Sequence, residues 1–258
     1  LEKTPYRVIH HARFEKFEAR LEKLESKLPK PTEPLVSLVV ASYNVAPYIE
    51  RFLASVFGQT MLPDGLEVIL VNDGSTDRTG EMIDDWQARY PVNIRVVHQE
   101  NGGVCAARNA GLMIAKGAWV GFPDPDDFLD PNYFQYMVAE IQRKHTKPLL
   151  AVISNMIFYF EDRDAFSDTH PLRYRFSEPV TRLSSDDLKD FMQLSGATAW
   201  LHRETLVRHG ITFDERVKPT FEDAHLLNRL LLLTPRRTVS FVSRAIYYYR
   251  KRSDQSSL

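Results

Sequence analysis

The first half of the chain alternates short apolar runs with longer amphipathic stretches. The apolar runs, typical of strands, cover residues 35–41, 66–71, 94–97 and 119–122. The amphipathic stretches, typical of helices, cover residues 45–58, 78–89 and 103–116. This alternation predicts an α/β fold with a mostly parallel sheet flanked by helices. Because the strands are apolar almost throughout, we expect helices on both faces and a ligand crevice at the carboxyl ends of the strands.

After about residue 145 the pattern is less regular. An apolar run at 149–153 predicts a strand, and a polar and aromatic stretch follows at 158–176. A helix is predicted near 185–193, and an aromatic strand ends at 247–249. There is no internal repeat. The second half therefore contributes a less regular region beside the predicted parallel sheet.

The first 28 residues are highly charged but carry one apolar stripe. Its members recur every three or four residues: Phe14, Phe17, Leu21, Leu24 and Leu28. This spacing predicts one long amphipathic helix, which Pro29, Pro31 and Pro34 end. The stripe spans only about two heptads, so it could dock on the main domain or contact a further domain or a second copy. We predict a helix and Pro-rich linker over 1–33 and the main domain over 34–258.

Composition narrows the class of protein. The chain has 33 Lys and Arg against 34 Asp and Glu, a net charge of -1, which argues against binding nucleic acid. Cys105 is the only cysteine, so an internal disulfide and a thiolate zinc cluster are excluded. No apolar run approaches the roughly 18 residues that span a bilayer, and no signal peptide opens the chain. We expect a cytoplasmic location, with peripheral contact at the inner face of the membrane left open, and one module of a longer polypeptide.

Two strand ends carry residues suited to binding a nucleotide. After the first strand, the small residues of Ala41-Ser42-Tyr43-Asn44 permit close approach of a ligand, and Tyr43 offers a flat surface for a base. After the second strand, Asp73 places a carboxylate at the edge of the sheet, where it can accept from a nucleobase imide. The alternative interpretation is that Asp73, Ser75 and Asp77 only cap the next helix.

A third segment, residues 101–111, opens the helix predicted at 103–116. Its glycines leave the first turn open to an anion, and Arg108 could bind a phosphate with two hydrogen bonds. The alternative is a glycine-rich helix start with Arg108 in a surface salt bridge. Cys105 lies among small residues and is interpreted as a packing residue.

The fourth strand is followed by Asp124-Pro125-Asp126-Asp127. Three carboxylates within four residues repel one another unless a cation or solvent separates them. Mg²⁺ and Mn²⁺ prefer oxygen ligands, and Mg²⁺ uses one or two carboxylates together with substrate phosphates. We therefore predict a divalent cation here. The alternative is a solvated helix start, with Asp127 or Asp130 as the cap.

Together these segments resemble the inverting family 2 glycosyltransferases over roughly residues 34–258. The most specific matches are Val71-Asn72-Asp73-Gly74-Ser75, Ala107-Arg108-Asn109 and Asp124-Pro125-Asp126-Asp127. The resemblance implies the GT-A fold, whose sheet is Rossmann-like. It implies transfer of a hexosyl or N-acetylhexosaminyl group from a nucleotide-diphosphate donor, most commonly a UDP-sugar, to a hydroxyl of a glycan, lipid-linked or protein-linked acceptor. Surface polysaccharide biosynthesis is the expected setting.

The resemblance also carries residue roles. The nucleotide-sugar site would comprise Ala41, Tyr43, Asp73, Arg108, Asp124, Pro125 and Arg250. Asp124 would approach the ribose, and Asp126 with Asp124 would hold Mn²⁺ or Mg²⁺. The basic residue Arg250 would fold over the diphosphate. Residues 34–130 would form the nucleotide-sugar half and residues 131–258 the acceptor side.

A later acidic pair, Glu222 and Asp223, opens a helix, as in this family. Asp223 is the preferred general base and Glu222 its rival, because adjacent helical residues point about 100° apart. Both could also serve only to complement the helix dipole. Trp200 and His202 are candidates for the acceptor site. No histidine follows His225, so the identity of a third metal ligand stays open.

Other classes of function remain as alternatives. One is a non-catalytic sugar-binding or scaffolding module tethered through the N-terminal helix. Another is a sugar-phosphate nucleotidyltransferase, which would have a glycine-rich loop with Arg and Lys after the first strand, whereas residues 41–44 contain none of these. An NAD-dependent oxidoreductase is set aside because no G-x-G-x-x-G follows the first strand.

Overall fold

The main domain is seen in a computed structural model that describes residues 34–63, 65–144, 146–188, 195–217 and 221–252. These residues lie in one compact unit. The amphipathic helix and linker predicted over 1–33 lie outside them, so that prediction stays untested. None of the helices in the described ranges is long and apolar enough to cross a membrane.

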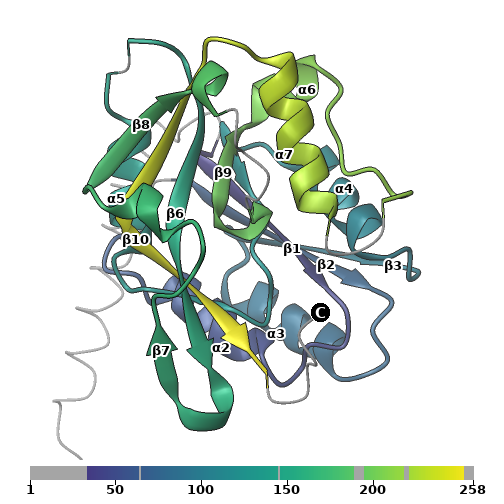
Figure 1. Cartoon of the computed structure of the whole chain (residues 1–258). Coiled ribbons are helices and arrows are strands. Elements are labelled where there is room, and N and C mark those ends of the chain that lie inside the picture. The colour runs from purple at the N-terminus through teal and green to yellow at the C-terminus, as the bar shows by residue number, and fades with distance from the viewer. Residues whose placement is uncertain (1–33, 64, 145, 189–194, 218–220, 253–258) are drawn as a thin grey trace, which may run out of the picture. The chain divides into compact units, whose positions relative to one another are not determined.

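The described strands form one twisted sheet (Figure 1). Its main order is β3 (Ile94–Gln99), β2 (Leu66–Asp73), β1 (Val36–Ser42), β4 (Trp119–Gly121), β9 (Ala199–His202), β6 (Leu149–Phe160), β10 (Thr238–Lys251) and β5 (Phe128–Leu129). Two further strands pair at the side, β7 (Ala165–Ser167) with β6 and β8 (Val180–Ser184) with β10. The longest ladders, β1 with β2, β2 with β3 and β6 with β10, are parallel. Strand β9 is antiparallel to both of its neighbours and joins the two parallel groups.

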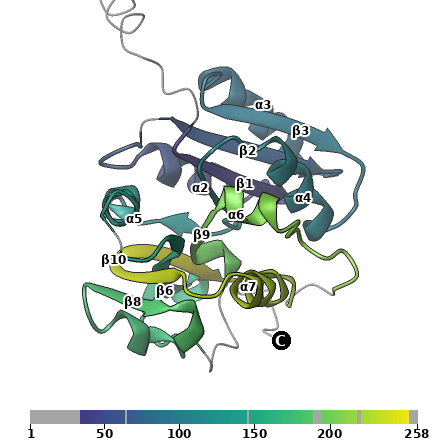
Figure 2. The same cartoon turned by 90° about the horizontal axis from the view of Figure 1, so that it is seen from above.

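Helices cover both faces of this sheet, as the apolar strands predict. They are α2 (Ile49–Phe57), α3 (Thr79–Arg89), α4 (Val104–Ile114), α5 (Tyr133–Ile141), α6 (Arg203–Arg208) and α7 (Glu222–Leu233). Helices α2, α3 and α5 share one apolar cluster with the sheet, and α4, α6 and α7 share another. Figures 1 and 2 show α2 and α3 on the opposite side of β1–β3 from α4. The predicted α/β architecture is therefore confirmed.

Alternation along β1 explains how the two layers are built. Leu38 and Val40 point into the cluster of α2 and α3, whereas Val39 points toward α4. A Cβ atom added to Gly111 of α4 would lie only 2.3 Å from Cγ1 of Val39. Because glycine permits this close approach, α4 packs tightly on β1, and its first turn lies near the carboxyl ends of the parallel strands.

The irregular half differs from its sequence prediction in two places. The strand expected at 149–153 continues to Phe160, because its backbone pairs with β10 over most of its length. The helix expected near 185–193 is wrong for its described part, where only one 3-10 turn, η3 (Ser185–Asp187), is present. There the Ser185 N–H donates to the Arg237 carbonyl at 2.8 Å, and its hydroxyl donates to the Thr234 carbonyl at 3.0 Å. These bonds to the loop between α7 and β10 replace the bonds of a continued helix.

Three more 3-10 turns, η1 (Glu161–Arg163), η2 (Arg173–Phe176) and η4 (Gly196–Thr198), lie in the same half. Of these, η4 matters for the site because it precedes β9 and approaches the start of α7.

Candidate active site

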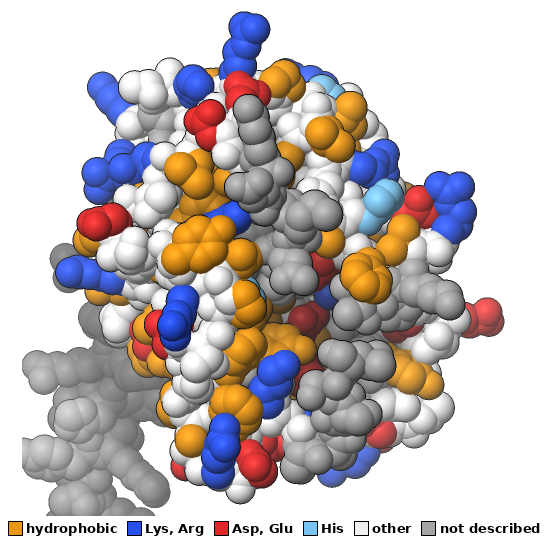
Figure 3. Space-filling model, viewed as in Figure 1, with side chains coloured by type: hydrophobic (Ala, Val, Ile, Leu, Met, Phe, Trp, Pro, Cys, Tyr) orange, Lys and Arg blue, Asp and Glu red, His pale blue; other side chains and the backbone are white. Residues whose placement is uncertain are grey.

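An open cleft of about 460 Å³ lies at the carboxyl ends of β1, β2 and β4. Six residues predicted from the sequence line it: Ala41, Tyr43, Asp73, Asp124, Pro125 and Asp126. Tyr43 is 49% exposed, which leaves its ring free to stack on a base. Figure 3 shows acidic side chains at the bottom of a hollow in the centre of this face. The strand-end motifs therefore meet at one place, as the parallel topology requires.

Asp73 shapes the wall of the cleft. Its carboxylate accepts hydrogen bonds from the backbone N–H groups of Gly102 and Gly103, both at 2.9 Å, and from the Gln99 amide at 2.7 Å. Gly103 has a φ of 87°, a conformation that glycine adopts without strain. Asp73 thus fixes the loop that starts α4 and is not a cap of α3.

The capping interpretation is correct for Asp77 instead. Its Oδ1 accepts from the Thr79 N–H at 2.9 Å at the start of α3. Its Oδ2 accepts from the Ala46 N–H at 3.1 Å. The Asn44 side chain in turn accepts from the Thr76 N–H at 2.8 Å. These bonds tie the loops after β1 and β2 together and hold Tyr43 at the mouth of the cleft.

Arg108 joins the two halves of the domain. It is 3% exposed, and its guanidinium donates to Asp124 at 2.9 Å, to Asp223 at 2.8 Å and to Glu222 at 3.1 Å. Burial alone would lower the pKa of Arg108, but the three carboxylates outweigh it and raise the pKa, so the side chain stays charged. Instead of a surface salt bridge, Arg108 makes a buried cluster behind the cleft.

The three carboxylates after β4 have three different environments. Asp124 pairs with Arg108, and its backbone N–H donates to the Tyr247 hydroxyl at 3.0 Å. Asp126 pairs with Arg252. Asp127 is buried and accepts from the Tyr247 hydroxyl at 2.7 Å and the Arg250 N–H at 2.8 Å. Asp127 therefore supports the loop, and α5 begins only at Tyr133, so Asp127 does not cap it.

The pKa values of these groups reflect their crowding. Burial raises the pKa of Asp124 to about 7, opposed by Arg108 and supported by the negative charges of Asp126 and Asp223. Burial beside Asp126 and Asp124 raises the pKa of Asp127 well above its usual range. Because Asp124 and Asp127 both resist ionisation, a cation placed beside them would be favoured electrostatically.

The prediction for Arg250 needs correction, because this side chain does not line the cleft. It is 4% exposed, and its guanidinium donates to the Asp126 carbonyl at 2.6 Å and to Glu161 at 2.7 Å. Two residues that the sequence analysis missed, Tyr249 and Arg252, line the cleft instead. The basic tail 247–252 indicated the segment, but nothing in it shows which arginine faces the ligand.

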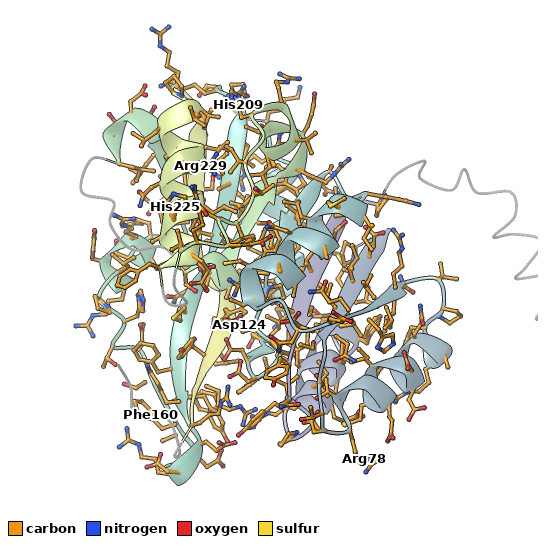
Figure 4. The ribbon with its side chains drawn as sticks, turned by 90° about the vertical axis from the view of Figure 1, so that its right-hand side faces the viewer. Arg78, Asp124, Phe160, His209, His225 and Arg229 are labelled. Atoms are coloured by element: carbon orange, nitrogen blue, oxygen red, sulfur yellow. The ribbon has the colours of Figure 1, made fainter. Side chains whose placement is uncertain are left out.

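Glu222 and Asp223 open α7 and join the cluster around Arg108. Asp223 is the more exposed of the two, 17% against 9% for the side chains. Its Oδ2 accepts from the Gly196 N–H at 2.9 Å, and a Cβ at Gly196 would lie 2.8 Å from the Asp223 carboxyl carbon. Burial and the charge of Glu222 raise the pKa of Asp223, although Arg108 opposes them. Figure 4 shows Asp124 beside β10, with His225 and Arg229 further along α7.

Trp200 and His202 do not contribute to this site, which corrects the acceptor prediction. Trp200 is 1% exposed and packs its ring against Tyr133 and Phe134 in the core. His202 pairs with Trp119 at the amino end of β4, whereas the cleft lies at the carboxyl end. Its Nδ1 lies 2.8 Å from the Thr205 hydroxyl at the start of α6. Trp200 is therefore enclosed in the core, whereas His202 lies at the opposite end of β4 because β9 runs antiparallel to it.

The residues present fit a cation that is completed by substrate. Asp124 and Asp126 line the same cleft and offer carboxylate oxygens. The described residues contain no cluster of three or more His, Cys, Asp or Glu side chains that could hold a metal ion. Mg²⁺ commonly uses one or two carboxylates and takes its other ligands from substrate phosphates and water. The pair therefore suits a cation shared with a diphosphate better than an all-protein site.

Comparison with known proteins defines the class. Residues 37–206, more than half of the chain, match the family model described as Glycosyl transferase family 2. The chain belongs to this family. It is 30% identical over 221 residues to the minor teichoic acid biosynthesis protein GgaB of Bacillus subtilis, covering 86% of this chain and 23% of GgaB.

Solved structures confirm the GT-A fold. The crystal structure of Staphylococcus aureus TarS in complex with UDP-GlcNAc superposes with a TM-score of 0.71 at 25% identity, covering 86% of this chain and 61% of that chain. The mannosyltransferase PcManGT from Pyrobaculum calidifontis, in complex with GDP-Man and Mn²⁺, superposes with a TM-score of 0.60 at 21% identity, covering 94% and 66%. The last likeness concerns the fold alone. Since the chain spans less than two thirds of GgaB and TarS, the activities of those whole proteins are not transferred to it.

Proposed function

We propose that this domain is a metal-dependent inverting glycosyltransferase that moves a hexosyl or N-acetylhexosaminyl group from a UDP-sugar to a hydroxyl of a glycan, lipid-linked or protein-linked acceptor. The observation that carries the proposal is the position of Arg108. It binds Asp124 from the donor cleft and Glu222 and Asp223 from α7 with one guanidinium. Asp124 is about a hundred positions from Glu222 and Asp223 in the sequence, and Arg108 brings all three into one cluster.

The donor assignment follows from the cleft. Tyr43 offers an exposed ring for a base, and Asp73 lies buried in the cleft wall with acceptor oxygens. Asp124 and Asp126 would hold Mn²⁺ or Mg²⁺ against the diphosphate. The cation would neutralise the charge that grows on the departing diphosphate. The complex of TarS with UDP-GlcNAc and that of PcManGT with Mn²⁺ support UDP and a divalent cation as the first ligands to test.

Transfer with inversion requires a base on the acceptor side. The acceptor hydroxyl would attack the anomeric carbon from the face opposite the diphosphate while a carboxylate takes its proton. Asp223 suits this role better than Glu222, because its side chain is more exposed. Burial also raises the pKa of Asp223, which makes it a stronger base than an ordinary aspartate. Arg108 would act as a positioning residue that holds Asp223 and Asp124 in a fixed relation.

The likeness to GgaB supports a place in the synthesis of a cell-surface polymer. The sequence alternatives of a scaffold module and a nucleotidyltransferase have no comparable observation in their favour. The acceptor would be selected by residues 131–258 as a whole.

The experiment that tests the proposal measures binding and slow hydrolysis of UDP-, GDP- and dTDP-sugars by the full chain with Mn²⁺. We expect binding and release of the nucleotide from a UDP-sugar, and loss of both with EDTA. Absence of binding and hydrolysis with every donor would overturn the proposal. An Asp126→Asn variant is the matched control, because it removes one predicted metal ligand from the cleft and should weaken donor binding.

A further inference from the structure

Arg252 occupies one oxygen of a carboxylate that a cation in the cleft would use. Its Nε donates to Oδ2 of Asp126 at 3.0 Å, and one terminal nitrogen donates to the same oxygen. The guanidinium also lies over the Tyr48 ring, 4.8 Å from the centroid. Both partners of the ion pair are sheltered, with side chains 22% and 18% exposed. The pair therefore sits inside the donor cleft, which Asp126 and Arg252 both line.

A guanidinium and a divalent cation cannot use one carboxylate oxygen together without strong repulsion. We propose that Arg252 competes with the divalent cation for Asp126, so that the cation binds weakly alone and tightly together with the diphosphate of the donor. The inference rests on the proposed function only for the identity of that diphosphate. Competition for Asp126 itself follows from the contact.

The diphosphate supplies the other half of the exchange. When the cation takes Asp126, Arg252 gives up this charge-assisted pair inside a partly sheltered cleft, which costs free energy that a new anion can offset. A diphosphate held by the same cation would offer that anion, and a guanidinium binds phosphate oxygens well. Cation and nucleotide would therefore each raise the affinity of the other by the same factor, as linkage requires.

The two neighbouring basic residues cannot make this exchange. Arg250 is buried, and its guanidinium is held by Glu161 and the Asp126 carbonyl. Lys251 has its ammonium 4.9 Å from the Phe158 ring centroid and 4.8 Å from that of Tyr249. Lys251 makes no described contact with Asp126, so Lys251→Gln removes the same charge from the adjacent position without breaking the pair.

The test is isothermal titration of Mn²⁺ into the full chain without nucleotide, for the wild type, Arg252→Gln and Lys251→Gln. We expect Arg252→Gln to bind Mn²⁺ about tenfold more tightly, since a charge-assisted pair in a sheltered site no longer opposes the cation. Lys251→Gln should stay within about twofold of the wild type, because only its long-range charge is lost. Arg252→Lys should bind Mn²⁺ nearly as weakly as the wild type. Thermal unfolding without metal checks that all variants are folded.

The second arm of the experiment repeats the Mn²⁺ titrations with saturating UDP. UDP should tighten Mn²⁺ binding by the wild type by a larger factor than by Arg252→Gln, because only the wild type exchanges partners. Equal Mn²⁺ affinities of Arg252→Gln and Lys251→Gln, or no Mn²⁺ binding by Arg252→Gln, would overturn the competition. If no variant binds UDP, the proposed function fails, whereas the titrations without nucleotide still decide whether Arg252 competes for Asp126.

Discussion

The two halves of the domain hold their functional residues in different ways. In the loops after β1 and β2, carboxylates and amides are fixed by backbone N–H groups, as Asp73 is by Gly102 and Gly103. In the later half, side chains reach the site through long-range pairs, as Asp223 does through Arg108 and Arg252 through Asp126. The first arrangement is rigid because it follows from the sheet and its turns. The second depends on a few charged contacts.

This difference separates binding from chemistry. In the proposed function the base of the nucleotide would be recognised by the first half, because Tyr43 and Asp73 already line the cleft there. In the proposed reaction the base is Asp223, and the guanidinium of Arg108 links it to Asp124. A change at Asp223 should therefore lower turnover more than donor affinity, and changes in the first half should act on folding and binding.

Asp223→Asn gives the largest expected effect. Loss of the base should lower the rate of transfer roughly 10²–10⁴-fold, the usual contribution of general-base assistance, with the Kd for the UDP-sugar nearly unchanged. Transfer kinetics and donor titration measure the two quantities. Glu222→Gln is the matched control and should cost less. Wild-type turnover in Asp223→Asn would refute its role as the base.

Gly111→Ala probes the rigidity of the first half. The added Cβ would lie 2.3 Å from Cγ1 of Val39, so α4 or β1 must shift. Such overpacking should lower the free energy of unfolding by about 1–3 kcal/mol. Urea denaturation measures it. Met113→Ala on the same helix, where the side chain is 85% exposed, should change little. Equal stability of the two variants would contradict the tight packing of α4.

Tyr247→Phe tests the contact between the later half and the loop that carries Asp124 and Asp127. It removes the hydroxyl that accepts from the Asp124 N–H and donates to Asp127, leaving a part-buried N–H and a buried carboxylate without this partner. We expect a loss of about 1–3 kcal/mol in stability and a rise in donor KM. Tyr248→Phe is the control, because its hydroxyl bond to Asp130 is longer, 3.3 Å, and less buried. Similar effects of both variants would contradict a special role of the Tyr247 hydroxyl in supporting this loop.

The smallest expected effect concerns pH. The base must be ionised, and burial beside Glu222 raises the pKa of Asp223 above the ordinary value of about 3.9. Activity should therefore be full above this raised pKa and fall as the pH drops through it, earlier than for an exposed aspartate. A profile of kcat at saturating substrates measures this acidic limb. Its persistence in the residual activity of Asp223→Asn would assign it to another group.

The sequence predicted correctly that the strand-end segments meet in one cleft. The runs before Tyr43, Asp73 and Asp124 were recognisable, and the carboxyl ends of parallel strands necessarily meet at one edge. It failed for Trp200, whose side chain is buried in the core. It also failed for His202, which an antiparallel strand places at the opposite edge. It also chose Arg250 over Arg252, since burial along β10 is set by neighbours from distant parts of the chain.

The sequence by itself determined the family, the alternating α/β pattern and the acidic and glycine-rich segments of the donor cleft, because these depend on local periodicity and turn chemistry. Only the tertiary structure decided the separate partners of Asp124, Asp126 and Asp127. It also decided that Arg108 is buried as a link to α7. The physical reason is that ion pairs and burial depend on groups brought together over more than a hundred residues, and no local pattern records which of them meet.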